Sequence, residues 1–322
     1  MDSYSALARF KSEYLSFPPF ARAMDEVESL LQLYRQTGIA KNLLIQGESG
    51  TGKTTLCLAL KQKYPQVSLE DRDLIPVLHV PIPPAATIAG TLEAMLAKLG
   101  DPSPGSGTIS AKTARAIKLA KACGVELILF DEGQHVQDRG RLPTQYLVGD
   151  CLKMIIDEVA VPTVLLGLPR VEMLLRVNEQ LRRRFTRRVQ MALGQDEKFP
   201  LHMECLQLFT SLAPALPVPL TFGGYDWNEF GHRLHAATDG RVGYVKVLLL
   251  ASIGLVFRHD LKEISPRELE TAFTEEIWDA GIGPLNPFNE RFEFRQLHRV
   301  GEPFERAVPA TTSRRRQANA AV

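Results

Sequence analysis

A glycine-rich octet supplies the residue types that grip a chain of phosphates. GESGTGKT, residues 47–54, matches the pattern G-x-x-x-x-G-K-[ST] and lies between an apolar run and a helix-like run, as that pattern requires. Its glycines let backbone N–H groups point at the β-phosphate from a helix N-terminus, and its lysine reaches the β- and γ-phosphates. The residues expected to bind the nucleotide are Gly47, Glu48, Ser49, Gly50, Thr51, Gly52, Lys53, Thr54 and Thr55.

An acidic pair about eighty residues later supplies the second half of such a site. LILFDE, residues 127–132, is an apolar strand pattern that ends in Asp131 and Glu132. We expect Asp131 to hold Mg²⁺ together with Thr54, directly or through water, and Glu132 to polarise the attacking water. A carboxylate base is typical of ATPases that hydrolyse with their own base, and no NKxD-type guanine signature occurs in the chain, so ATP is favoured over GTP. A solvated acidic strand end is the structural alternative.

Arginines crowd the segment NEQLRRRFTRR, residues 178–188. An arginine from one subunit that touches the γ-phosphate of its neighbour would stabilise the transition-state charge and make hydrolysis depend on assembly. Arg184 is the first candidate and Arg183 the second, although the sequence does not separate them from Arg182, Arg187 and Arg188. The alternative is that all five are surface or nucleic-acid contacts.

Two further sets of basic residues are candidate phosphate contacts. Arg241, in TDGRVGYVK, begins a predicted helix of the second lobe, where it could touch bound phosphate or act only as a cap or salt-bridge partner. Lys112, Thr113, Arg115 and Lys118 belong to a helix in which positive charges recur every three residues and continue at Lys121. No aromatic residues interleave with them, which favours contact with a DNA backbone over base stacking. An ordinary solvated helix face is the alternative.

The elements that must position these residues alternate between strands and helices. Strands are predicted at residues 42–47, 77–83, 125–132 and 163–169, with helices after the glycine-rich loop and over 87–100, 111–124, 151–161 and 171–185. This alternation predicts an α/β fold whose parallel sheet is flanked by helices on both faces. From about Pro217 only helices are predicted, and SPRE, residues 265–268, is a capping box. The predicted divisions are an N-terminal helical segment 1–38, a nucleotide-binding core 39–215, an all-helical lid 216–285 and a flexible tail 286–322.

The overall composition limits the fold class and the cellular location but does not indicate a binding partner. The 322 residues are 45% hydrophobic and 23% charged with net charge +1, which suits one large core with a smaller lobe. Four cysteines lie far apart without CxxC or Cys/His ligand spacing, so neither zinc nor a disulfide framework is indicated. The N-terminus lacks a signal-peptide pattern, and the apolar run 245–257 is too short to span a bilayer. We therefore expect a cytoplasmic protein without a membrane partner.

Taken together, six motifs resemble the AAA+ ATPases that regulate DNA transposition, the TniB/TnsC group, with MuB, initiators and helicase loaders as more distant relatives. These motifs are NLLIQGESGTGKTT, LILFDEGQHV, PTVLLGLP, QLRRRF, DGRVGYVKVLL and IWDAGIGPLNPF. The first two occur in many ATPases, whereas the order of all six is more specific. The resemblance covers nearly the whole chain.

The resemblance implies an AAA+ P-loop core with a helical lid and an ATP- and Mg²⁺-dependent ATPase. It also implies a homo-oligomeric ring or filament on double-stranded DNA, bound without sequence preference. Such a protein would link a target selector, TniQ-like or a CRISPR effector as in a CRISPR-associated transposon, to the transposase. In this comparison Arg184 is the arginine that acts across the interface, the helix 112–121 faces DNA, and the polar tail after Pro287 is similar to a transposase hook.

Two positions depart from the group, and two other functions stay open. Leu168 stands where a small polar residue is usual, so the polar sensor must come from elsewhere, with Thr163 and Gln134 as candidates. Arg241 directly follows Gly240, which separates it from the usual sensor position. The alternatives are an ATPase of the helicase-loader or replication-initiator type, and a signalling NTPase scaffold that binds no DNA. A neighbouring gene for a DDE-type integrase would favour transposition, and one for a replicative helicase would favour a loader.

Overall fold

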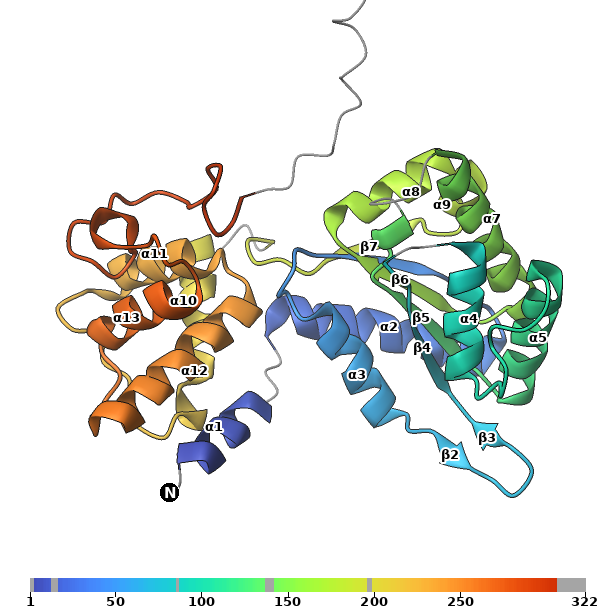
Figure 1. The fold of residues 1–322 in the computed structure, drawn as a ribbon, viewed down its shortest axis with the longest axis horizontal. Helices are drawn as coiled ribbons and strands as arrows, with labels where there is room; N and C mark the ends of the chain where they lie inside the picture. The colour runs from blue at the N-terminus through green and yellow to red at the C-terminus, as the bar shows by residue number, and fades with distance from the viewer. Residues whose placement is uncertain (1–2, 13–16, 85–86, 137–141, 196–198, 306–322) are drawn as a thin grey trace, which may run out of the picture. The chain divides into compact units, whose positions relative to one another are not determined.

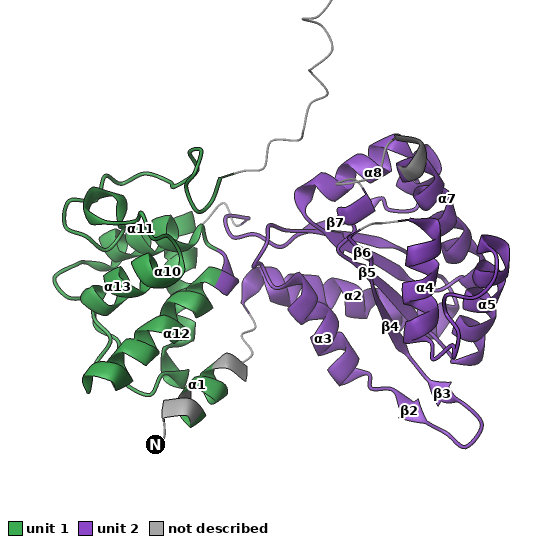
Figure 2. Ribbon diagram, viewed as in Figure 1, with its two compact units in different colours: residues 1–13, 199–240, 244–322 green, residues 14–198, 241–243 purple. Residues whose placement is uncertain are grey.

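The computed structural model describes residues 3–12, 17–84, 87–136, 142–195 and 199–305, and the chain divides into two compact units (Figures 1 and 2). Residues 14–198 and 241–243 make one unit, called here the core unit. Residues 1–13, 199–240 and 244–322 make the other, called the helical unit.

The core unit is built on a five-stranded sheet in which every pairing is parallel. The strands stand in the order β4 (Val77–Pro81), β5 (Leu127–Asp131), β6 (Thr163–Gly167), β1 (Leu43–Gln46) and β7 (Arg187–Gln190). The short strands β2 (Val67–Ser68) and β3 (Asp73–Leu74) form a separate antiparallel pair. Because β6 separates β1 from β5, the residues that follow β6 lie between the glycine-rich loop and the acidic pair. The predicted parallel α/β sheet is confirmed.

Helices flank this sheet because its inner strands β1, β5 and β6 bury side chains on both faces. Residues from β1, β4, β5 and β6, among them Leu44, Val80, Phe130 and Leu165, share one hydrophobic core with the helices α4, α5 and α7. The helices α2 and α3 pack on each other. The helical elements of this unit are α2 (Pro18–Thr37), α3 (Lys53–Lys63), α4 (Ile88–Lys98), α5 (Ile109–Ala122), α7 (Leu142–Val159), η1 (Pro169–Val171), α8 (Glu172–Val177) and α9 (Glu179–Arg182).

The single helix predicted over 171–185 is wrong in one respect, since it breaks at Asn178. That residue has an extended backbone, with φ −110° and ψ 98°, and its side chain caps the next helix by accepting a hydrogen bond from the Leu181 N–H. The chain then enters β7, a strand that the arginine-rich sequence did not reveal. The arginines therefore lie on α9, on the turn after it and on an edge strand.

The helical unit contains the later helices and the N-terminal one. Its elements are α1 (Ser3–Ser12), α10 (Leu201–Ser211), η2 (Ala213–Ala215), α11 (Trp227–Thr238), α12 (Val242–His259), α13 (Pro266–Glu276) and η3 (Gly283–Leu285). The capping box at Ser265 is present, because the Ser265 N–H donates to Glu268 and the serine hydroxyl accepts from the first turn of α13. Helix α12 has 18 residues and is therefore longer than the 13-residue apolar run seen in the sequence. By length and composition alone it could cross a membrane. Its residues Val245, Leu249 and Ile253 are fully buried, so we interpret it as a core helix.

The structure draws the boundaries elsewhere than the sequence predicted. The break between units falls after residue 198 and not after 215, and α1 and α2 belong to different units. The segment expected to be a flexible tail from residue 286 is packed as far as residue 305, because Phe288, Leu297 and Phe304 are at most 2% exposed. The rest of the tail, including the arginines at 314–316, lies outside the described residues.

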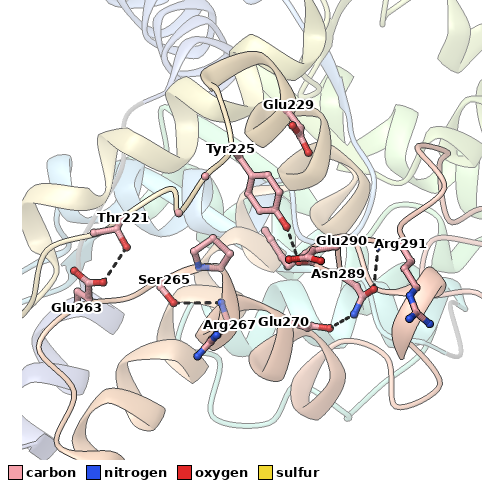
Figure 3. Close-up of a pocket in the computed structure, with 14 residues that line it drawn as sticks. Thr221, Tyr225, Glu229, Glu263, Ser265, Arg267, Glu270, Asn289, Glu290 and Arg291 are labelled. Atoms are coloured by element: carbon pink, nitrogen blue, oxygen red, sulfur yellow. Dashed lines mark hydrogen bonds between the residues drawn. The ribbon is translucent and has the colours of Figure 1, made fainter.

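Buried hydrogen bonds hold this closing segment in place. The Arg233 guanidinium, 2% exposed, donates to the carbonyls of Pro287 at 2.7 Å and Asn289 at 2.8 Å. Figure 3 shows the cavity of about 770 Å³ that the segment forms with the ends of α11 and α13, where Asn289 donates to Glu270 at 2.7 Å. This part of the chain is thus a structural component of the helical unit.

Candidate nucleotide-binding site

The glycine-rich loop has the backbone that a phosphate cradle needs. Gly50 and Gly52 adopt φ of 82° and 93°, a region that side chains with a Cβ rarely enter. At Gly47 a Cβ would lie 2.5 Å from Thr51 Oγ1 and 3.0 Å from the Met191 carbonyl oxygen, so only glycine fits there. Helix α3 begins at Lys53 directly after the loop, which directs its unpaired N–H groups towards the cradle.

Lys53 lies in the cradle with its side chain almost covered. Its residue is 7% exposed, and the Nζ atom donates to the carbonyls of Gly47 at 2.7 Å and Glu48 at 2.9 Å. Burial lowers the pKa of Lys53, while the carboxylates of Glu132, Asp131 and Glu48 oppose that shift. The charge of Arg241 also lowers the pKa of Lys53, which locates this arginine near the loop. Arg241 itself is 9% exposed.

The first residues of α12 contact the loop. The Gly243 N–H donates to the Gly50 carbonyl at 2.7 Å, and a Cβ at Gly243 would lie 2.9 Å from Gly50 Cα. A Cβ at Gly52 would approach Val242 and the ring of Phe20. The expectation that Arg241 lies near phosphate therefore fits the geometry, because its neighbours at 242 and 243 pack on the loop that would hold the phosphates.

Thr54 and Asp131 meet as a magnesium site requires. The Thr54 hydroxyl donates to Asp131 Oδ2 at 2.9 Å, across 77 residues of sequence. Burial raises the pKa of Asp131, but hydrogen bonding from His79, Thr54 and the Glu132 N–H outweighs it and holds the pKa below the usual value. A hydroxyl and an ionised carboxylate are the oxygen ligands that Mg²⁺ prefers, so these residues fit the ion.

Glu132 is held in an unusual conformation by its neighbours. Its φ is +59°, in the left-handed region, and its N–H donates to Asp131 Oδ1 at 2.8 Å. The Gln134 amide donates to Glu132 Oε2, and Gln134 Oε1 accepts from the Leu168 N–H at 3.0 Å. A non-glycine residue in this conformation marks local strain, which is often found at functional sites. Gln134 thus fixes both the Glu132 carboxylate and the residue that follows β6.

The structure distinguishes the two sensor candidates. Gln134 and Leu168 line a cavity of about 240 Å³ together with the loop and Glu132. Thr163 is the first residue of β6, whereas the site lies beyond its last residue, Gly167, about 13 Å further along the strand. Gln134 therefore stays a candidate sensor, and Thr163 is excluded. The residues that line this cavity are Ser49, Gly50, Gly52, Lys53, Thr54, Thr55, Glu132, Gln134 and Leu168.

Two residues that the sequence did not single out belong to this site. His79, on β4, places Nε2 3.5 Å from Asp131 Oδ2. Cys57, one turn after Lys53 on α3, is fully buried, and burial raises the pKa of its thiol well above the usual value. A histidine within the apolar strand VLHVP was the available signal for the first. Nothing in the sequence around Cys57 pointed to the second.

The arginines expected to act across an interface do not line this cavity. Arg183, Arg184 and Arg187 line another depression of about 560 Å³, together with Lys41. Arg184 is held by Asp157 through two hydrogen bonds, Nε to Oδ1 at 2.7 Å and Nη2 to Oδ2 at 2.6 Å. Arg183 is exposed and pairs with Glu179. Each of these arginines is thus paired on the surface of its own chain.

The predicted DNA-contact helix needs a correction. Lys112 and Thr113 are 6% and 5% exposed, and Lys112 forms an ion pair with Glu93. Arg115 bonds Asp101 and two loop carbonyls, so it fixes the loop before α5. These residues do not form the expected exposed basic face, because the apolar side of α5 packs against α4 and α7 and takes Lys112 with it. Lys118 and Lys121 are exposed.

Comparisons with known proteins agree with this geometry. The sequence matches the family model described as bacterial TniB protein over residues 8–192, more than half of the chain. The chain belongs to the TniB family. No curated protein matches the sequence. With this fold and site, the TniB chain is an AAA+ ATPase.

Solved structures similar to this TniB chain include a Cdc6p protein and two ORC proteins. Cdc6p from Pyrobaculum aerophilum superposes with a TM-score of 0.61 at 13% identity, over 84% of this chain and 70% of that one. The Aeropyrum pernix ORC2 protein, in ADPNP–ADP complexes, has a TM-score of 0.57 at 15% identity, over 83% of this chain and 71% of that one. The Aeropyrum pernix ORC1 protein, in complex with DNA, has a TM-score of 0.59 at 14% identity, over 81% of this chain and 66% of that one. At such identities the likeness shows the AAA+ fold.

Proposed function

We propose that this TniB ATPase assembles on double-stranded DNA in its ATP-bound form and links a target selector to the transposase. The selector is a TniQ-like protein or a CRISPR effector, and the assembly is a homo-oligomeric ring or filament without sequence preference. Hydrolysis of ATP, with Mg²⁺ on Thr54 and Asp131, times the release of the assembly. Membership in the family supports this proposal, and the ORC1 structure in complex with DNA is in keeping with its DNA-binding part.

The observation that most supports assembly is the separation of the arginines from the nucleotide cavity. None of the described residues that line the cavity is an arginine, although Lys53, Thr54 and Glu132 all do so. Charge that develops on the γ-phosphate is best stabilised by a guanidinium, and the cluster after residue 181 is on a different surface of the core unit. A neighbouring subunit could present this cluster to the cavity.

The local contacts rank the candidates for this arginine. Arg184 would have to leave a bidentate pair with Asp157 before it could reach a neighbour. Arg183 would give up only an exposed pair with Glu179, which is worth little. Arg182 is exposed, and within the described part of the chain its guanidinium has no recorded partner. Arg182 and Arg183 therefore join Arg184 as arginines to be tested.

Mixed assemblies test the interface. Lys53→Ala subunits bind nucleotide weakly but keep their arginines, so mixing them with Arg182→Ala, Arg183→Ala or Arg184→Ala subunits should restore hydrolysis for the arginine that acts in trans. Alone, the Lys53→Ala protein and the variant of that one arginine should each hydrolyse ATP far more slowly than the wild type. An absence of restored hydrolysis in all three mixtures would contradict the trans arginine.

Length-dependent binding to random duplex DNA in the presence of ATP tests the DNA part. We propose Lys118 and Lys121 as contacts, so Lys118→Glu should weaken binding and reduce the salt slope by about one unit. Lys262→Glu, the same charge change at an exposed position of the helical unit, is the control. A protein that binds no duplex at low salt would favour the signalling scaffold. Stimulation by a replicative helicase in place of a transposase would favour a loader.

A further inference from the structure

Three side chains with metal-binding atoms converge behind the nucleotide cavity. Cys57 Sγ, a ring nitrogen of His79 and a carboxylate oxygen of Asp131 all lie within 4.8 Å of one another. The three residues come from α3, β4 and β5, separated by 22 and 52 positions in the sequence. The spacing rules applied to the sequence could not detect this cluster, because the parallel sheet brings its members together.

The donor set suits a thiophilic divalent cation. A thiolate, an imidazole and a carboxylate are the ligands that Zn²⁺ takes in proteins, at bond lengths of about 2.0–2.3 Å. Two ligands around a tetrahedral ion then stand about 3.3–3.8 Å apart. The 3.5 Å between His79 Nε2 and Asp131 Oδ2 already meets that spacing. The remaining approach to one ion needs side-chain shifts of about 1 Å.

His79 provides an independent indication of a ligand. Its Nε2 atom is buried, and beyond the long 3.5 Å contact with Asp131 Oδ2 no described residue forms a hydrogen bond with it. A buried polar atom with only so long a contact is weakly satisfied, and coordination to a cation would remove the remaining cost. The side chains of His79 and Asp131 are 12% and 2% exposed, and Cys57 is fully buried. The cluster is therefore shielded from bulk water.

We propose that Cys57, His79 and Asp131 form a Zn²⁺ site whose occupation stops ATP hydrolysis. Asp131 Oδ2 is the oxygen that accepts the Thr54 hydroxyl, so a cation bound to it takes this carboxylate from the position that serves Mg²⁺. Binding converts the Cys57 thiol into a thiolate, and its proton passes to solvent. A water or nucleotide oxygen completes the coordination. The inhibitory half of this proposal rests on the ATPase site described above.

Metal-free full-length protein titrated with Co²⁺ alone tests the site directly. Co²⁺ takes the same ligands, and a thiolate bound to it gives a near-ultraviolet charge-transfer absorption that needs no hydrolysis. We expect one equivalent to give this absorption and Zn²⁺ to displace it. Cys57→Ala should abolish the absorption. His79→Gln should weaken binding at least about 10–100-fold, since even the loss of a residue behind a ligand costs that much.

Cys151→Ala, which removes another buried cysteine of the core unit, is the matched control and should keep the absorption. Thermal unfolding establishes that each variant is folded. The titration of the wild-type protein tests the metal site even if a variant does not fold. A wild-type protein with no thiolate absorption, or one in which Cys57→Ala retains it, would overturn the site. Separately, Zn²⁺ with Mg²⁺ in excess should inhibit ATP hydrolysis by the wild type and not by Cys57→Ala, each compared with itself. Unchanged wild-type hydrolysis at saturating Zn²⁺ would refute the inhibitory half.

Discussion

The Glu132→Gly variant should be more stable than the Glu132→Ala variant, the reverse of the order found inside a helix. Glu132 has φ +59°, where a Cβ costs about 1–2 kcal/mol and glycine costs nothing. Glycine also has greater freedom in the unfolded chain, which offsets about 0.5–1 kcal/mol of that gain. Both substitutions remove the carboxylate and its contact with Gln134, so those losses cancel in the comparison. From the middle of both ranges, Glu132→Gly should therefore be more stable than Glu132→Ala by about 0.75 kcal/mol.

Thermal unfolding without nucleotide measures this difference. For a unit of this size, it corresponds to about 1–4 °C in melting temperature. The control is Gln32, an exposed residue in the interior of helix α2, where the glycine variant should be less stable than the alanine variant by about 1 kcal/mol. If Glu132→Ala is as stable as Glu132→Gly, the backbone at this position is not strained, and strain does not mark Glu132 as a functional residue.

Other predictions concern the site and the helical unit. Lys53→Ala should weaken ATP binding about 10–100-fold, because it removes one charge-assisted phosphate contact worth about 1.5–3 kcal/mol. Titration with a fluorescent nucleotide measures the affinity. An unchanged affinity would contradict the role of Lys53 in binding phosphate. Because the folded-state pKa of Asp131 lies below the usual value, its ionisation stabilises the fold at neutral pH, and this stability is lost as the pH falls from about 3.9 through the lower folded-state pKa. Acid unfolding should therefore narrow the gap between wild type and Asp131→Asn, and a constant gap would disprove the coupling. Phe304→Ala should cost about 3–5 kcal/mol in denaturant unfolding, whereas a negligible cost would restore the flexible tail.

The nucleotide site was predictable to the extent that its chemistry is local in the sequence. Residues 47–54 form a loop between one strand and one helix, so the pattern itself specifies the backbone. The pairing of Thr54 with Asp131 followed once both strands were assigned to one parallel sheet. Gln134 was only a candidate, because its role depends on Leu168 at the end of the intervening strand β6.

Features that depend on tertiary packing could not be predicted from the sequence. Lys112 fits a basic stripe by its spacing, but the side chain turns to Glu93 on α4 and becomes buried. Residues 286–305 look like a polar tail, although Phe288 and Phe304 are buried in the helical unit. Arg233 also binds the backbone carbonyls of Pro287 and Asn289. His79 lies inside an apolar strand, where burial was expected and a neighbouring carboxylate was not. In each case the deciding partner is distant in sequence.

The edge strand β7 gives its arginines a protective role as well. It pairs with β1 on one side only, so its other side presents unpaired N–H and C=O groups that could accept a strand from another molecule. Arg187 and Arg188 are exposed there and pair with Glu26 and Glu172. Charged side chains on a short edge strand disfavour edge-to-edge association. Replacing both with apolar residues would therefore make the sheet prone to aggregation, even if neither arginine touches DNA or nucleotide.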